Sequence, residues 1–174
     1  MLGVFLYLVS TILEWCLSIP GLLHVIYAAI RRRDSKKFSL KEFNRSLNKE
    51  GLNSALAKDI SGNVSYSTML NDWFIKKGGY HYGKAGETIS SATGKNMMKG
   101  TLTWLGKGLA GFLNLVDFRN WKNGGHCWVS IDDNNYREAF RQPSWYSHIL
   151  WVIPFLAVVL PLIYGLIKFW QWVL

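Results

Sequence analysis

Hydrophobic residues gather at the two ends of the chain, and polar residues with helical spacing fill the middle. Residues 148–174 read HILWVIPFLAVVLPLIYGLIKFWQWVL, with Lys168 as the only fixed charge. About 20 apolar residues are enough for a helix to cross the ~30 Å hydrocarbon core of a bilayer. Trp and Tyr rings stand at both ends of this run, as is typical of membrane interfaces. The pattern predicts a transmembrane helix over residues 148–174.

The other end of the chain is also apolar. Residues 1–30 contain no Lys, Arg or Asp and are followed by Arg31, Arg32 and Arg33. A helix of that length would be longer than the hydrocarbon core, so we expect either one tilted helix or two pieces split at Pro20. Glu14 and His24 would then be intramembrane polar residues, and a carboxyl group in hydrocarbon normally faces a polar partner or the protein interior.

The charges place the middle of the chain on one side of the predicted membrane. Of the 20 Lys and Arg residues, all except Lys168 lie within residues 31–147, and the net charge is +9 at pH 7. Basic segments next to membrane spans are retained on the cytoplasmic side. The expected fold class is therefore all-α: an integral membrane helical hairpin with both termini outside and a small basic helical domain, residues 31–147, inside.

The middle domain has the spacing of short amphipathic helices and no strand pattern. Ser39 and Glu42 form a capping box that predicts a helix start, and this helix is expected to end at Gly51. A glycine-rich loop is expected over residues 80–84. Further helices are predicted over residues 53–60, 64–77, 96–116 and 127–136, together with a short helix that begins at Glu87 or Thr88 and ends at Gly94.

Few residues carry readable catalytic chemistry. The CxxC, HExxH, GxxxxGK[ST] and GxSxG motifs are absent. His126 and Cys127 are the most reactive-looking pair, because a thiolate beside an imidazolium can act as a nucleophile or a metal ligand. Adjacent residues on a helix point about 100° apart, however, so His126 would not naturally activate Cys127. We expect no catalytic residue, no metal and no cofactor.

An ordered set of motifs lies between residues 57 and 131. It consists of an acidic residue on an apolar helix, the run ETISS followed by glycine and lysine, and an aspartate before the pair HC. Its residues are Asp59, Asn63, Glu87, Thr88, Ser90, Ser91, Gly94, Asp117, His126 and Cys127.

The order and spacing of these motifs resemble a family of small, largely uncharacterised proteins of bacteriophages and prophages. The chain departs from the family pattern at Ile60, where the family usually has Gln, and at Ala92, where it has a basic residue. The resemblance implies a phage origin and a shared local role for the motif residues. That role is either to cap and clamp two helices or to ligate something small.

The excess of basic residues predicts a polyanionic partner, either anionic lipid headgroups or nucleic acid. The residues expected to make these contacts are Arg31, Arg32, Arg33, Lys36, Lys37, Lys76, Lys77, Lys95 and Lys99.

These features predict a non-enzymatic, phage-encoded integral membrane protein with a structural or genome-delivery role. It would lie in a virion membrane or a bacterial inner membrane and associate with itself or with other membrane or capsid subunits. One alternative is a protein that permeabilises a membrane or excludes superinfecting phage. Another is a membrane-tethered enzyme or metal site that uses Cys127.

Overall fold

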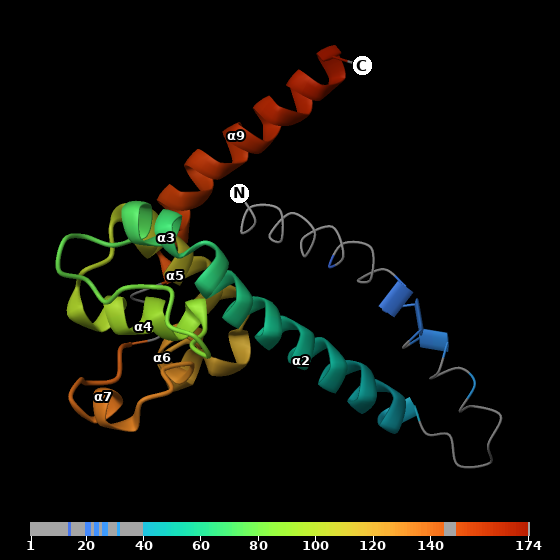
Figure 1. Ribbon diagram of the computed structural model, residues 1–174, viewed down its shortest axis with the longest axis horizontal. Coiled ribbons are helices and arrows are strands. Elements are labelled where there is room, and N and C mark those ends of the chain that lie inside the picture. The colour runs from blue at the N-terminus through green and yellow to red at the C-terminus, as the bar shows by residue number, and fades with distance from the viewer. Residues whose placement is uncertain are drawn as a thin grey trace, which may run out of the picture. The chain divides into compact units, whose positions relative to one another are not determined.

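The computed structural model describes residues 40–144 and 149–173, with a few positions of the first 31 (Figure 1). These positions are Glu14, Pro20, Gly21, Leu23, His24, Ile26, Tyr27 and Arg31, all of them helical. The elements are α2 (Leu40–Ser65), α3 (Ser67–Phe74), α4 (Ile89–Lys99), α5 (Trp104–Val116), the 3₁₀ helix η2 (Phe118–Asn123), α6 (His126–Val129), α7 (Asn134–Glu138) and α9 (Val152–Val173).

The all-α class is confirmed, because the only β pairing in the described part of the chain is an isolated bridge between Ile75 and Leu102. The membrane hairpin is wrong. None of the helices formed by the described residues is long and apolar enough to cross a membrane. The prediction counted apolar residues without regard to their contacts. Helix α9 begins at Val152 and not at His148, and its first turns pack against α5.

The chain forms two compact units, Met1–Ala55 and Leu56–Leu174, and the boundary falls inside α2. Helix α2 joins the two helices predicted over residues 39–51 and 53–60, because it continues through Gly51 without a break. Its predicted cap, Ser39, lies outside the described residues. The division into segments 1–30, 31–147 and 148–174 stays a prediction.

The helix predicted over residues 96–116 is two helices, α4 and α5. Gly100 adopts a left-handed conformation (φ 68°) and ends α4, as glycine commonly does. Leu102 then pairs with Ile75, and the Thr103 side chain caps α5 by accepting a hydrogen bond from the Gly106 amide. The apolar spacing runs through this break, so periodicity alone did not reveal it.

Helix α4 lies at the centre of the second unit, against both α5 and α6. It was expected to end at Gly94, but it continues to Lys99. Gly94 allows α6 to approach closely, because a Cβ atom there would overlap with the carbonyl oxygen of Cys127. The buried apolar core includes Leu70, Ala92, Met97, Leu102, Ala110, Cys127 and Ile131.

Helix α9 is attached to this unit through α5. Gly108 of α5 lies directly against the Phe155 side chain, and the Lys107 ammonium lies 5.5 Å from the centre of the Trp151 ring. The first turn of α9 is thereby part of the same compact unit as the motif residues.

Candidate functional site

The loop between α3 and α4 is held by the side chains of three asparagines. Asn71 accepts a hydrogen bond from the Tyr82 amide (2.8 Å) and donates to the Tyr82 carbonyl (3.2 Å). Asn96 does the same for Tyr80, at 2.8 and 2.7 Å. Each side-chain amide therefore pairs with the backbone N–H and C=O of one loop residue, as a neighbouring strand would do in a sheet. This fixes a loop that contains several glycines and has little regular structure of its own.

Asn63, the third asparagine, holds the end of the loop next to α4. Its amide donates to the carbonyls of Lys84 (3.2 Å) and Glu87 (2.9 Å), and its oxygen accepts from the Gly83 amide (3.2 Å). Asn63 and Asn96 are both fully buried. These contacts anchor the loop backbone to α2, α3 and α4. The loop side chains of Tyr80 and Tyr82 add hydrogen bonds to Glu87 and Thr93.

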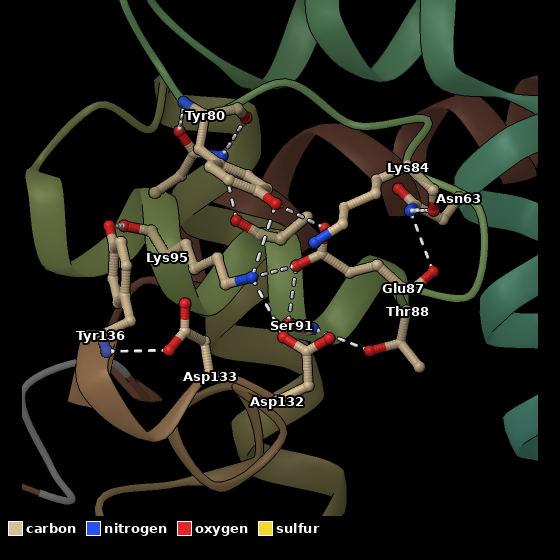
Figure 2. Close-up of polar contacts among 12 residues, drawn as sticks. Asn63, Tyr80, Lys84, Glu87, Thr88, Ser91, Lys95, Asp132, Asp133 and Tyr136 are labelled. Carbon is tan, nitrogen blue, oxygen red and sulfur yellow. Dashed lines mark hydrogen bonds and ion pairs between the residues drawn. The ribbon is translucent and has the colours of Figure 1, made fainter.

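A buried ion pair lies beneath this loop (Figure 2). The Lys95 ammonium lies 2.6 Å from Glu87 Oε1 and 3.0 Å from Asp132 Oδ1. Glu87 also accepts from the Tyr80 hydroxyl and the Ser91 hydroxyl, each at 2.8 Å. The side chains of Glu87 and Lys95 are only 1% and 3% exposed, so both charges are almost completely removed from water.

The pair controls the protonation of its neighbours. Desolvation alone would lower the pKa of Lys95, but its hydrogen bonds to Glu87 and Asp132 outweigh that effect and raise the pKa. Desolvation alone would raise the pKa of Asp132, yet the Lys95 ammonium lowers it. Burial, followed by the hydrogen bond to Glu87, raises the pKa of Tyr80. Lys95 therefore stays charged and Tyr80 stays protonated at neutral pH.

A second chain of polar contacts joins α2, α4 and α6. Ser90 Oγ donates to Asp59 Oδ2 (2.7 Å) and lies 3.1 Å from His126 Nε2. His126 Nδ1 lies 2.9 Å from Asp117 Oδ2. Desolvation would raise the pKa of Asp117, but the contact with His126 outweighs it and lowers the pKa. Because the Ser90 hydroxyl donates to Asp59, it can only accept a hydrogen bond from His126. A neutral imidazole has one N–H, so donation to both Ser90 and Asp117 requires the protonated form of His126.

The order Ser90–His126–Asp117 has the contacts of a hydrolytic triad but not its accessibility. A serine nucleophile must give its proton to the histidine and reach the substrate. Here the Ser90 hydroxyl donates to Asp59 instead, and Ser90 is 1% exposed. The geometry therefore favours a clamp between helices over a nucleophile.

Cys127 is also poorly placed for chemistry. It is completely buried, and burial raises the pKa of its thiol. A reactive cysteine needs a stabilised thiolate and access to solvent, and Cys127 has neither. Its backbone amide instead donates to Asn114 Oδ1 (2.9 Å). Within the described residues, no group of three or more His, Cys, Asp and Glu side chains is arranged to hold a metal ion.

The structure brings the motif residues together around α4. Thr88, one of the two expected caps, caps α4 by accepting from the Ser91 amide (2.9 Å). Glu87 and Ser91 belong to the ion-pair cluster, and Asp59, Ser90, Asp117 and His126 form the second chain of contacts. Gly94 and Cys127 form the close contact between α4 and α6.

The other residues singled out from the sequence include one member of the ion-pair cluster, Lys95. Glu14 and His24 are exposed and helical, and the His24 ring lies 6.4 Å from Tyr27. Arg31, Lys76, Lys77 and Lys99 are exposed, whereas Lys95 is buried in the ion pair. The remaining four, Arg32, Arg33, Lys36 and Lys37, lie outside the described residues.

Sequence reasoning missed some partners of the motif. Asn71 and Asn96 were not singled out, and neither Asp132 nor Tyr80 was recognised as a partner of Lys95 or Glu87. Asparagine is a weak helix former, so an asparagine inside a helix is a signal that its side chain has another role. Asn71 and Asn96 both carry that signal. Nothing near Asp132 in the sequence reveals its contact with Lys95, 37 residues away.

Comparison of the chain with protein-family models, with curated proteins and with solved structures gives no match. The resemblance to phage and prophage proteins therefore stays a prediction that rests on the motif residues.

Proposed function

We propose that this chain is a phage-encoded, non-enzymatic protein with a structural or genome-delivery role, and that its second unit binds the phosphate groups of nucleic acid. The observation that carries the proposal is the excess of exposed basic side chains in that unit. Between residues 56 and 144, eight basic side chains are exposed, against four acidic ones.

The acidic residues of the cluster have internal partners. Glu87 and Asp132 bind Lys95, Asp59 accepts from Ser90, and Asp117 contacts His126. Of the basic residues, Lys95 is the one that is buried in this cluster. Between residues 56 and 144 the exposed basic residues are Lys58, Lys76, Lys77, Lys84, Lys99, Arg119, Lys122 and Arg141. The exposed acidic residues in the same range are Asp72, Asp132, Asp133 and Glu138. The exposed surface is therefore net positive, and such a surface attracts phosphates.

Three of these lysines lie on adjacent backbone segments. The Lys76 amide donates to the Thr101 carbonyl (2.8 Å), which brings the residues after α3 next to the end of α4. Lys76, Lys77 and Lys99 thus belong to one edge of the unit. The asparagine contacts hold the loop that follows, so little conformational freedom is lost when a ligand binds there.

The buried network supports a scaffold role. Hydrogen bonds join the side chains of Glu87, Lys95 and Asn96 to other residues of the same unit. Cys127 and Ser90 are inaccessible, which argues against an enzyme that uses either as a nucleophile. The phage origin rests on the resemblance of the motif residues alone.

The proposal is tested by measuring the affinity of the full-length chain for a duplex DNA oligomer at several salt concentrations. Each phosphate contact contributes about 0.9 to the slope of log affinity against log salt. Lys76→Gln, Lys77→Gln and Lys99→Gln should each lower this slope and weaken binding. Lys168→Gln, which removes the same charge from α9, is the matched control and should leave both unchanged.

Two results would contradict the proposal. One is the absence of salt-dependent DNA binding by the wild-type chain. The other is binding to vesicles that contain anionic lipid in place of DNA, because the basic edge would then recognise headgroups and not nucleic acid.

A further inference from the structure

Two tryptophans lie opposite each other at the junction of α3 and α5. The Lys76 amide donates to the Thr101 carbonyl (2.8 Å), and the Thr103 amide donates to the Phe74 carbonyl (3.0 Å). Ile75 pairs with Leu102 between them in an antiparallel bridge. Phe74 and Thr103 come next in this register, and they are followed by Trp73 near the end of α3 and Trp104 at the start of α5. The Thr103 hydroxyl fixes the junction by donating to the Trp73 carbonyl (2.6 Å).

Both tryptophan side chains are more than half exposed, at 58% for Trp73 and 53% for Trp104. The bridged residues between them, Ile75 and Leu102, are buried. Met69, four residues before Trp73 on the same face of α3, is also exposed. The exposed rings and Met69 form apolar surface at this junction, and contiguous apolar surface commonly marks a binding site.

The charge beside these rings indicates the kind of ligand. Lys76 and Lys77 follow Trp73 directly in the chain, and both are exposed. Asp72 is also exposed, but its position on α3 is about 100° around the helix from that of Trp73. Exposed aromatic rings with adjacent cations are the features that bind single-stranded nucleic acid, since bases stack on the rings and phosphates bind the cations.

We propose that Trp73 and Trp104 form a stacking platform for unpaired bases, and that Lys76 and Lys77 bind the phosphates of the same strand. This inference rests on the proposed function and refines it: the preferred ligand is single-stranded and not duplex nucleic acid. A duplex keeps its bases stacked on each other, so it offers phosphates to the lysines but no free base faces to the rings.

The first experiment uses the wild-type chain. Fluorescence anisotropy gives its affinity for a labelled oligothymidylate, for an abasic oligomer of the same length and for a duplex. The thymidylate should bind at least about 25-fold more tightly than the abasic oligomer, because two bases are stacked and each contributes at least about fivefold. Equal affinities for the thymidylate and the abasic oligomer would overturn the platform even if both bind.

The second experiment uses variants of the same chain. Trp73→Ala and Trp104→Ala should each weaken thymidylate binding by at least about fivefold and leave duplex binding unchanged. Trp170→Ala is the matched control, because Trp170 is 60% exposed on α9, outside this junction. Trp73→Phe keeps a ring and should retain most of the affinity if Trp73→Ala perturbs folding. Loss of duplex binding in Lys76→Gln with no effect of the Trp variants would support the proposed function and reject the platform.

Discussion

At the scale of single residues, Lys95 makes contacts that are unusual for a lysine. Its ammonium is bound by two carboxylates, and it lies 4.7 Å from the centre of the Tyr80 ring. Its backbone carbonyl accepts from the Tyr136 hydroxyl (2.8 Å), so the residue connects α4 to α7 as well. A buried ion pair stabilises a fold little more than an apolar pair of similar size does. Removing one partner of the pair, however, leaves the other as an uncompensated buried charge.

Replacing Lys95 with Met should therefore be more damaging than replacing the whole pair. We expect Lys95→Met to lower the free energy of unfolding by about 3–5 kcal/mol, because Glu87 keeps a buried charge. In the double variant Glu87→Gln, Lys95→Met, much of that loss should be restored. The measurement is urea unfolding followed by circular dichroism. Additive effects of the two substitutions would contradict the coupling described here.

At this scale the sequence predicted which residues matter better than it predicted what they do. The motif named Ser90 and His126 together with their partners Asp59 and Asp117. It did not include Tyr80 or Asp132, because these residues come from segments that the sequence could not place beside α4. Lys95 was predicted on the surface, since an isolated lysine with no nearby acid in the sequence is usually exposed. Its two carboxylate partners are 8 and 37 residues away.

At the scale of elements, the packing of α4 depends on a glycine. Alanine usually stabilises a helix interior by up to about 1 kcal/mol relative to glycine. At Gly94 that gain is opposed by overlap of the new Cβ with the Cys127 carbonyl of α6. Backbone on the other side of the contact cannot rotate away as a side chain can, so α4 and α6 would have to separate.

We expect Gly94→Ala to destabilise the chain by about 1–3 kcal/mol, as overpacking in a core usually does. Gly165→Ala is the matched control, because a Cβ atom at Gly165 in α9 would meet nothing within 4 Å. This variant should be neutral or slightly stabilising. Thermal unfolding of both variants measures the difference, and a stabilised Gly94→Ala variant would rule out the close contact.

Elements were predicted well where the signal was local. Thr88, one of the two expected caps, caps α4 as capping rules describe. The end of α4 was predicted at Gly94, however, and the stop at Lys99 and Gly100 was not predicted. Elements were predicted poorly where the signal depended on another part of the fold. The break between α4 and α5 exists because Leu102 pairs with Ile75, a contact that periodicity within one segment cannot show.

At the scale of the whole molecule, the cluster makes stability depend on pH. The pKa values of Asp117 and Asp132 are lower in the folded chain than in model peptides, where they are about 3.9. Below that value the unfolded chain binds more protons than the folded chain, so stability falls as the pH falls. At neutral pH the contribution of both carboxylates is fully present.

We therefore expect the second unit to lose stability between about pH 4 and the lowered pKa values of the two aspartates. Asp132→Asn should be less stable than the wild type at pH 7 and should lose less stability on acidification. Urea unfolding between pH 2 and pH 7 measures both effects. Parallel curves for wild type and variant would show that Asp132 is not part of the acid response.

The largest error also belongs to this scale. Hydrophobic runs at both ends predicted a membrane hairpin, and the all-α class was the part of that prediction that held. Composition reports that a segment is apolar, but it does not report which neighbour covers it. For α9, α5 covers the first turns through the contact of Phe155 with Gly108. Further along the helix, Leu160, Tyr164, Ile167, Phe169 and Trp170 are exposed.

The anchoring of the loop by Asn63, Asn71 and Asn96 has a consequence for how such proteins can diversify. These side chains bind the backbone of the loop, whose amides and carbonyls are the same for almost every amino acid. Exposed loop positions such as His81, Lys84 and Ala85 can therefore vary while the fold stays constant. Related chains could acquire new ligand preferences at these positions by single substitutions, in the way that variable loops do on a constant framework.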